Sequence, residues 1–321
     1  MTTRGILLFA AMSVIWGIPY LLIRIAVAEI EPAMLVFART AIAAVILVPI
    51  ALVRLEVRPV LRHWRWVVAF AGVEIALPWL MLGSAEQTIS SSLAGLLVAG
   101  VPLVGAAIAA VVGGPDRVGR RQLMGLLIGF VGVAAIAGGD FDPGSLIALV
   151  QIAIVVVCYA LGPFILARRL VGVSSLGVMA VSLALTALLY APVSVAVWPA
   201  SMPSREVLAA ILILAVLCTA VAFLVFAALI REVGPVRATV ITYVNPVVAA
   251  VLGVVILQET LTAPMLIGFG LAIAGSTLAT RRPEPPEAEA AAVELLSAPL
   301  HADGGHFTHN GTITDPTRRE P

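Results

Sequence analysis

The stretch PYLLIR at residues 19–24 recurs as PFILAR at residues 163–168, 144 residues later in a chain of 321 residues. Four further residues fall on their own type under the same shift or one residue less: Ala94 on Ala238, Pro102 on Pro246, Gly125 on Gly268 and Gly132 on Gly275. One such match could arise by chance in a chain rich in Ala, Val and Leu, but a shared shift is much harder to obtain. The sequence therefore predicts two related halves.

The composition decides the class of protein. Hydrophobic residues make up 61% of the chain and charged residues 12%, against about 45–50% and about 25% in an ordinary soluble domain. The formal net charge is +1, so no overall field attracts nucleic acid. These values exclude a soluble enzyme, a disordered regulator and a nucleic-acid-binding protein. They predict a polytopic helical protein whose surroundings are the lipid bilayer.

Ten apolar runs are each long enough to cross a membrane as a helix, which takes about 20 residues. We expect helices at residues 5–28, 32–53, 66–85, 88–112, 122–139, 146–167, 174–197, 207–230, 235–257 and 264–280. An odd number of helices in each half makes the second half enter the membrane from the opposite side. The predicted fold is therefore all-α, with ten transmembrane helices in two inverted five-helix repeats, residues 1–140 and 141–282. Residues 283–321 are rich in Pro, Glu, Gly and His, which predicts a disordered tail.

The arginines predict the orientation, because positive residues favour the cytoplasmic side. Sixteen of the 19 basic residues, all of them Arg, lie at the termini or in connections on one side of the predicted membrane. The opposite connections contain acidic residues such as Glu29, Glu86 and Glu259, and a single arginine, Arg205. The pattern predicts that both termini lie in the cytoplasm, and the use of Arg as the one basic residue type indicates a bacterial source.

The segment from Pro235 to Thr262, PVRATVITYVNPVVAAVLGVVILQETLT, resembles the penultimate helix of EamA-type transporters in the drug/metabolite transporter superfamily. Gly268 and Gly275 in the next helix, Trp16-Gly17 near the start and Arg39 with Ala43 are similar to that family as well. The resemblance covers residues 5–280. It implies a ten-helix inner-membrane carrier, often an exporter of amino acids, related metabolites or drugs.

Two charged residues lie deep inside predicted helices. Arg39 is about 10 Å from the membrane surface at 1.5 Å per residue, and a charge at that depth normally faces a partner or a cavity. Its guanidinium could bind a substrate carboxylate in a bidentate fork, or it could snorkel or pair with an acid. Glu74 could couple transport to a proton, contact a substrate amine, or serve as the counter-ion of Arg39. Both are candidate substrate-binding residues.

Aromatic and proline residues add further candidates. Trp16 and Tyr20, beside Pro19, could form an aromatic wall for the apolar part of a substrate, or could simply pack in the core. Tyr243 and Asn245 form the other polar cluster, and could line the substrate path. A proline frees a backbone carbonyl one turn earlier, so Pro19, Pro102 and Pro246 are expected to shape their helices.

Other residues suggest no specific chemistry. Arg24, at a predicted helix end, is expected to snorkel or to pair with a nearby acid. Cys158 and Cys218 are expected to be apolar fillers, and the paired glycines to permit close helix contact. His301, His306 and His309 lie in the tail without metal-site spacing. We expect no cofactor, no metal and no enzymatic activity, since nucleotide-binding and nucleophile motifs are missing from the sequence.

The function predicted from these observations is secondary transport of a small organic solute by alternating access between the two repeats. The solute would be an amino acid or related metabolite, or a drug-like compound, and the direction would be export. The partners would be this solute, the lipid bilayer and a proton, in a monomer or homodimer. The alternatives are a membrane channel and a membrane-embedded enzyme or lipid-handling protein.

Overall fold

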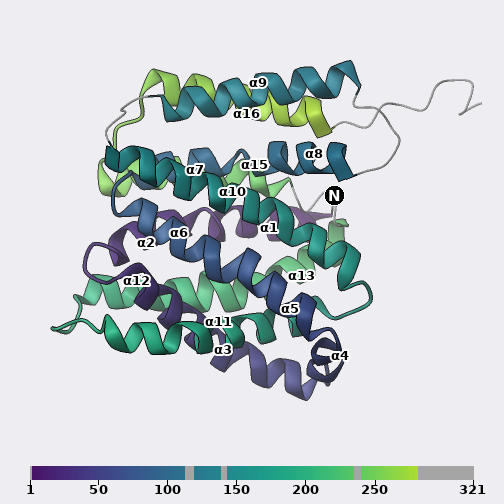
Figure 1. Ribbon diagram of the computed structural model, residues 1–321, viewed down its shortest axis with the longest axis vertical. Helices are drawn as coiled ribbons and strands as arrows, with labels where there is room; N and C mark the ends of the chain where they lie inside the picture. Colours follow the sequence, from purple (N-terminus) through teal and green to yellow (C-terminus); the bar gives the residue numbers. More distant parts are fainter. Residues whose placement is uncertain (1, 113–118, 139–142, 235–239, 281–321) are drawn as a thin grey trace, which may run out of the picture. The chain divides into compact units, whose positions relative to one another are not determined.

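The computed structural model describes residues 2–112, 119–138, 143–234 and 240–280, and these residues form helices and connections with no strand. Figure 1 shows the helices running back and forth beside one another. Their bounds are α1 Thr3–Ile15, α2 Ile18–Ala26, α3 Pro32–Val53, α4 Val57–Arg62, α5 Trp64–Phe70, η1 Ala71–Ala76, α6 Leu77–Glu86, α7 Ser91–Val98, α8 Val101–Val112, α9 Arg120–Ala137, α10 Pro143–Arg169, α11 Ser175–Ala196, α12 Arg205–Ala215, η2 Val216–Val221, α13 Ala222–Val233, α15 Ile241–Leu257 and α16 Ala263–Thr280.

These elements account for the ten predicted crossings. Among the described residues, nine helical stretches are long and apolar enough to span a membrane, and α15 is a shorter apolar helix. Several adjoining elements form one stretch, as α5, η1 and α6 do over Trp64–Glu86. The predicted all-α fold is confirmed. The predicted tail, residues 283–321, lies outside the described residues.

Two of the predicted helices are interrupted, each just before a proline. The first breaks between α1 and α2 at Trp16 and Gly17, ahead of Pro19, and another breaks between α7 and α8 at Ala99 and Gly100, ahead of Pro102. Proline has no backbone N–H and its ring crowds the preceding turn. Pro246 instead lies inside the unbroken helix α15.

Two π-helical segments occupy matching places in the two halves. Each boundary of η2 lies 145 residues after the corresponding boundary of η1. The helices α3 and α11 match as well, since both have 22 residues and they begin at Pro32 and Ser175. Segments of π-helix are rare and are frequent at functional sites. Their recurrence at one spacing shows the internal repeat in the backbone itself.

The two halves pack against each other through equivalent helices. α3 lies along α11, and α9 lies along α16. Gly132 and Gly268 face each other across α9 and α16, where a Cβ on either residue would lie 2.5 Å from the other residue's carbonyl oxygen. Gly125 and Gly275 meet in the same way. The predicted close contact between the paired glycines is confirmed.

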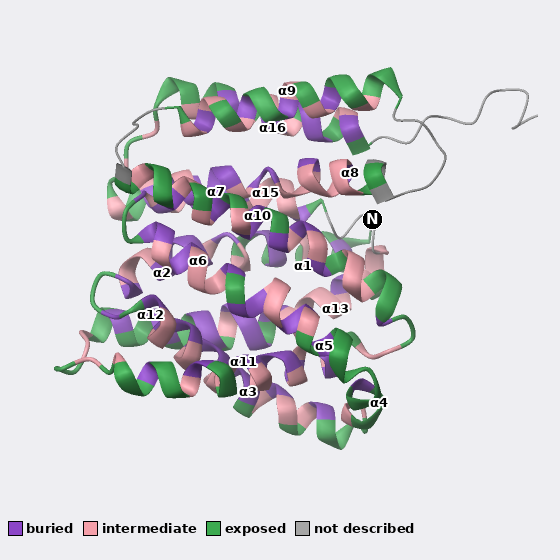
Figure 2. Ribbon diagram, viewed as in Figure 1, coloured by how far each residue is buried: buried purple, intermediate pink, exposed green. Residues whose placement is uncertain are grey.

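Helices α9 and α16 bury little of their surface, as the green and pink residues in Figure 2 show. Only 22% of the span in α9 and 28% of the span in α16 is buried. Their exposed residues include large apolar side chains such as Leu127, Phe130 and Ile267. Exposed apolar patches promote aggregation in water. In a membrane protein they are the surface that contacts lipid.

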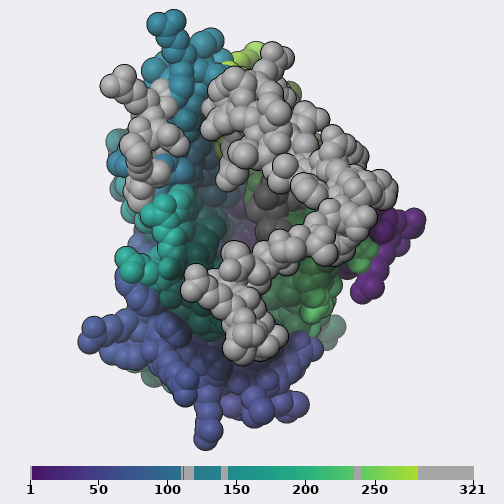
Figure 3. Space-filling view, turned by 90° about the vertical axis from the view of Figure 1, so that its right-hand side faces the viewer, coloured from purple at the N-terminus to yellow at the C-terminus, as the bar shows by residue number. Residues whose placement is uncertain are grey.

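The arginine-rich segments lie together at one end of the helices. Figure 1 shows the N-terminus, α4 and the connection between α10 and α11 at the same end. Figure 3 views that end and shows the blue segment near residue 55 and the teal segment near residue 170 on the same face. This arrangement agrees with the alternation of charge along the sequence.

Candidate functional site

Arg39 is buried inside the bundle and contacts both halves of the chain. It lies on α3 between the buried residues Val36 and Ala43, and its side chain is 7% exposed. Its Nε donates a hydrogen bond of 2.9 Å to Oγ1 of Thr219 on η2. Its guanidinium carbon lies 3.6 Å from the ring centroid of Trp79 on α6. A cation over the face of a tryptophan at this distance is attracted by the ring.

The guanidinium keeps most of its binding capacity. Arg39 forms no ion pair with any described carboxylate, and Thr219 is its one described hydrogen-bond acceptor. An arginine carries five N–H donors, so its two terminal nitrogens remain available to a ligand. Thr219 is itself held in place, because its hydroxyl donates to the carbonyl of Leu214 at 2.8 Å.

Glu74 occupies the place in η1 that Thr219 occupies in η2, since both are the fourth residue of a six-residue π-helix. Its Oε2 is buried and has no hydrogen-bond partner among the described residues. This oxygen faces Gly162 on α10, where a Cβ would overlap it. A buried polar atom without a partner is uncommon and often marks a functional group.

Tyr159 on α10 connects Glu74 to Arg39. Its hydroxyl lies within electrostatic range of both side chains and near the side chain of Trp79. The structure therefore brings Arg39 and Glu74 into one region, which we call the Arg39 site and define as Arg39, Glu74, Trp79, Tyr159 and Thr219. The two charges share Tyr159 and do not pair directly.

Sequence reasoning missed Tyr159 and Thr219. Each is a single polar residue in a long apolar helix, which no motif distinguishes. The repeat offers a signal for Thr219, because a shift of 145 residues places it on Glu74.

The predicted aromatic residues lie in two different places. Trp16 packs against Phe223 and Phe226 on the second repeat, with ring centroids 6.1 and 4.7 Å apart. Tyr20 is buried in the main core and interacts electrostatically with Tyr159. Tyr20 is thus adjacent to the Arg39 site, and Trp16 is packed between α1 and α13.

The polar groups of the predicted cluster on α15 join that helix to its neighbours. The hydroxyl of Tyr243 forms a hydrogen bond of 2.9 Å with Ser276 on α16. With its amide oriented to satisfy both groups, Asn245 donates to the carbonyls of Ile241 and Ser13. These contacts link α15 to α16 and α1.

The described residues contain no group of three or more His, Cys, Asp or Glu side chains that could hold a metal ion. Cys158 and Cys218 are free and buried.

Comparisons with known proteins agree with this architecture. The model of the EamA-like transporter family matches twice, over residues 3–138 and 146–281. The chain is 28% identical to the uncharacterized inner membrane transporter YedA of Escherichia coli over 272 residues, which cover 84% of this chain and 88% of YedA. It is 23% identical to the uncharacterized transporter YvbV of Bacillus subtilis over 92% of this chain and 98% of YvbV.

A solved crystal structure shares the fold. It has a TM-score of 0.62 and 22% sequence identity, covering 87% of this chain and 97% of its own. The repeated family match and the apolar helices establish the class of protein. The chain belongs to the EamA-like transporter family of the drug/metabolite transporter superfamily and is a multi-pass inner-membrane transporter.

Proposed function

We propose that this transporter is a secondary carrier that exports a small organic solute bearing a carboxylate, such as an amino acid or a related metabolite. Alternating access between the two inverted repeats would carry the solute, and the path would lie between the repeats near the middle of the bilayer. The location of the Arg39 site supports this proposal, since its residues come from both repeats.

The observation that carries the proposal is the buried guanidinium of Arg39. A charge inside a membrane protein is costly, and it normally marks a substrate or ion pathway. With Nε on Thr219 and the ring of Trp79 against one face, the two terminal nitrogens form the fork that a carboxylate binds bidentately. Because Arg39 is 7% exposed, a solute reaches it only when the surrounding helices move apart.

Glu74 would take the second role at this site. Its unpartnered Oε2 would accept a proton coupled to transport or a hydrogen bond from the amine of the solute. Tyr20 and Trp16 would contact the apolar part of the solute. Tyr243 and Asn245, with helices shaped by Pro19, Pro102 and Pro246, would form the remaining lining of the path.

A transport assay in proteoliposomes with an imposed pH step tests the assignment. Uptake of labelled amino acids by the wild-type protein is expected to depend on the pH step. Arg39→Ala is expected to lose transport and Glu74→Gln to lose the response to pH. If both variants transported as well as wild type, the assigned site would be wrong, but the assignment of the protein as a carrier would not be contradicted.

A further inference from the structure

A cavity lies away from the Arg39 site, at the end of the helices opposite α4 and the N-terminus. We call it the Arg24 cavity. It has a volume of about 870 Å³, which is within the range of small-molecule sites. Its lining comes from the end of α2, the turn between α6 and α7, the start of α12 and the segment after α15.

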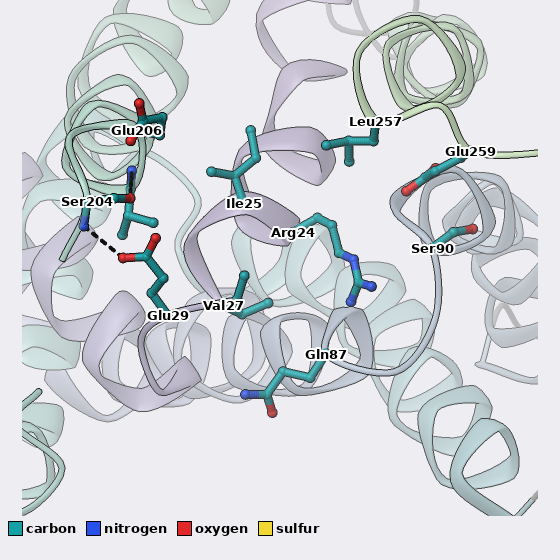
Figure 4. Close-up of a pocket in the computed structure, with 12 residues that line it drawn as sticks. Arg24, Ile25, Val27, Glu29, Gln87, Ser90, Ser204, Glu206, Leu257 and Glu259 are labelled. Atoms are coloured by element: carbon teal, nitrogen blue, oxygen red, sulfur yellow. Dashed lines mark hydrogen bonds between the residues drawn. The ribbon is translucent and has the colours of Figure 1, made fainter.

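The charges around the Arg24 cavity are mixed. Among the described lining residues Arg24 is the one cation, and Glu29, Glu206 and Glu259 are carboxylates. Figure 4 shows Arg24 on the side of Gln87, Ser90 and Glu259, with Glu29 and Glu206 across from it. A purely anionic ligand would be repelled by the excess of carboxylates, and a purely cationic one would leave Arg24 unused.

Arg24 is held in place by a hydrogen bond to the backbone and not by an ion pair with a described carboxylate. One terminal nitrogen donates to the backbone carbonyl of Glu86. It forms no ion pair with a described carboxylate, so its other N–H groups can bind a ligand. Gln87 and Ser90 beside it supply neutral hydrogen-bond donors.

Two of the lining carboxylates, Glu259 and Glu29, accept hydrogen bonds from neighbouring serines. Glu259 accepts hydrogen bonds from the backbone and hydroxyl groups of Ser91 and Ser92 at 2.5–2.9 Å. Partial burial opposes its charge, but these bonds outweigh that effect and lower the pKa of Glu259. Glu29 accepts a hydrogen bond of 2.7 Å from the backbone N–H of Ser204 through Oε2. The hydrogen bonds from Ser204 lower the pKa of Glu29.

Glu86, next to the lining residue Gln87, adds a carboxyl group at this end of the helices. Predicted to lie in a connection between two helices, it is completely buried, and neither of its carboxylate oxygens has a hydrogen-bond partner among the described residues. It interacts electrostatically with Arg24 and Glu259. Tyr20 interacts with both Glu86 and Tyr159. Electrostatic interactions thus extend from Arg24 through Glu86 and Tyr20 to Tyr159.

We propose that the Arg24 cavity is a second binding site, which holds a zwitterionic amino compound by its carboxylate on Arg24 and by its ammonium in the negative field of Glu29 and Glu259. This inference extends the proposed function, because the same class of solute would occupy both sites. The solute would bind in the Arg24 cavity on its way between the Arg39 site and the solution on that side of the membrane.

Cysteine protection in purified protein tests this site directly. Ala28 lines the cavity and is exposed, so Ala28→Cys introduces a thiol that a maleimide can reach. The native Cys158 and Cys218 are buried, and the protein without Ala28→Cys gives their background. Twenty amino acids are tested singly as protecting ligands. For one that protects, the matching compounds without the amine and without the carboxylate are tested as well.

At least one zwitterion is expected to slow labelling of Ala28→Cys threefold or more, and both truncated compounds are expected to protect at least tenfold more weakly. Arg24→Gln is expected to abolish protection. The matched control Arg205→Gln, also near this end but outside the cavity lining, is expected to retain it. Arg24→Lys is expected to retain part of it, which separates loss of charge from loss of folding.

The experiment also separates this inference from the proposed function. Protection is expected to persist with Arg39→Gln, even though transport is lost. Protection that survives Arg24→Gln, or that disappears with Arg39→Gln alone, would overturn the Arg24 site and leave the Arg39 site standing. Absence of protection by all twenty amino acids, or equal protection by a truncated compound, would overturn the zwitterion assignment.

Discussion

The side chain of Arg39, in the first repeat, donates a hydrogen bond of 2.9 Å to Thr219, in the second repeat. Thr219 lies in a π-helical segment, and its equivalent in the other π-helical segment is Glu74. Arg39 is thus hydrogen-bonded to the repeat equivalent of Glu74, whose Oε2 is a buried oxygen without a hydrogen-bond partner among the described residues. The pair makes Arg39 sensitive to any movement of one repeat against the other.

Replacement of Thr219 by Val is expected to weaken substrate binding. Val has a similar shape but offers no acceptor, so Nε of Arg39 loses its partner and the guanidinium is no longer fixed. A hydrogen bond to a charged group contributes about 1.5–3 kcal/mol, which corresponds to a rise in KM of about ten- to a hundredfold. Concentration-dependent uptake measures this. Thr219→Ser is expected to restore KM to near the wild-type value; an unchanged KM in Thr219→Val would contradict the role of this hydrogen bond.

Replacement of Gly162 by Ala is expected to displace the carboxylate of Glu74. The new Cβ would overlap Oε2, so the side chain must rotate away from α10. Stimulation of uptake by a pH gradient should then fall at least fivefold. Gly105→Ala is the control, because a Cβ at Gly105 meets nothing within 4 Å. Equal stimulation in the two variants would show that the position of Glu74 is unimportant for coupling.

Replacement of Gly132 by Ala is expected to destabilise the contact between α9 and α16. Its Cβ would lie 2.5 Å from the backbone nitrogen of Ala272, and a backbone atom cannot move aside cheaply. Overpacking costs about 1–3 kcal/mol, so Tm should fall by about 2–10 °C. Gly270→Ala on α16 meets nothing within 4 Å and should leave Tm within about 2 °C of wild type. Thermal unfolding in detergent that gave equal Tm values would disprove the close contact.

Replacement of Glu259 by Gln is expected to lower stability in a pH-dependent way. The hydrogen bonds from Ser91 and Ser92 lower the pKa of Glu259, so its stabilising effect is complete above the unfolded value of about 4.3 and is lost as pH falls through the lower folded value. Near pH 7 the Tm of the variant should be about 2–6 °C below wild type, the size expected for losing a helix cap.

The control for this prediction is Glu31→Gln, because Glu31 makes no side-chain cap bond at the start of α3. Its Tm should stay close to wild type from pH 7 to pH 4. The difference between wild type and Glu259→Gln should close below about pH 4. A difference that stayed constant to pH 3 would indicate that the charge of Glu259 contributes nothing.

Hydrophobicity and charge alternation predicted the helical fold because lipid imposes length and polarity on every crossing. The interruptions before Pro19 and Pro102 also follow from the sequence, since proline disturbs the preceding turn. The π-helical segments could not be predicted from the sequence. A π-helical turn contains one extra residue, and in a helix that is apolar on all sides this residue does not change the pattern of apolar and polar positions. Arg39 and Glu74 stood out from the sequence as charges in apolar runs.

The remaining residues of the Arg39 site depend on tertiary packing. Thr219 and Tyr159 are ordinary in composition, and only the crossing of η2 and α10 with α3 and η1 brings them to the charges. Glu86 is a further case. The sequence placed it in a connection between two helices, but it is the last residue of α6 and is completely buried.

Counterflow in proteoliposomes tests the carrier assignment most directly. Vesicles are loaded with an unlabelled substrate, and entry of the labelled substrate from a dilute outer solution is followed with no ion gradient. The expected result is saturable entry that transiently exceeds equilibrium in the wild type and is lost in Arg39→Ala. Entry that rises linearly with concentration and shows no transient accumulation would contradict alternating access and would indicate a channel.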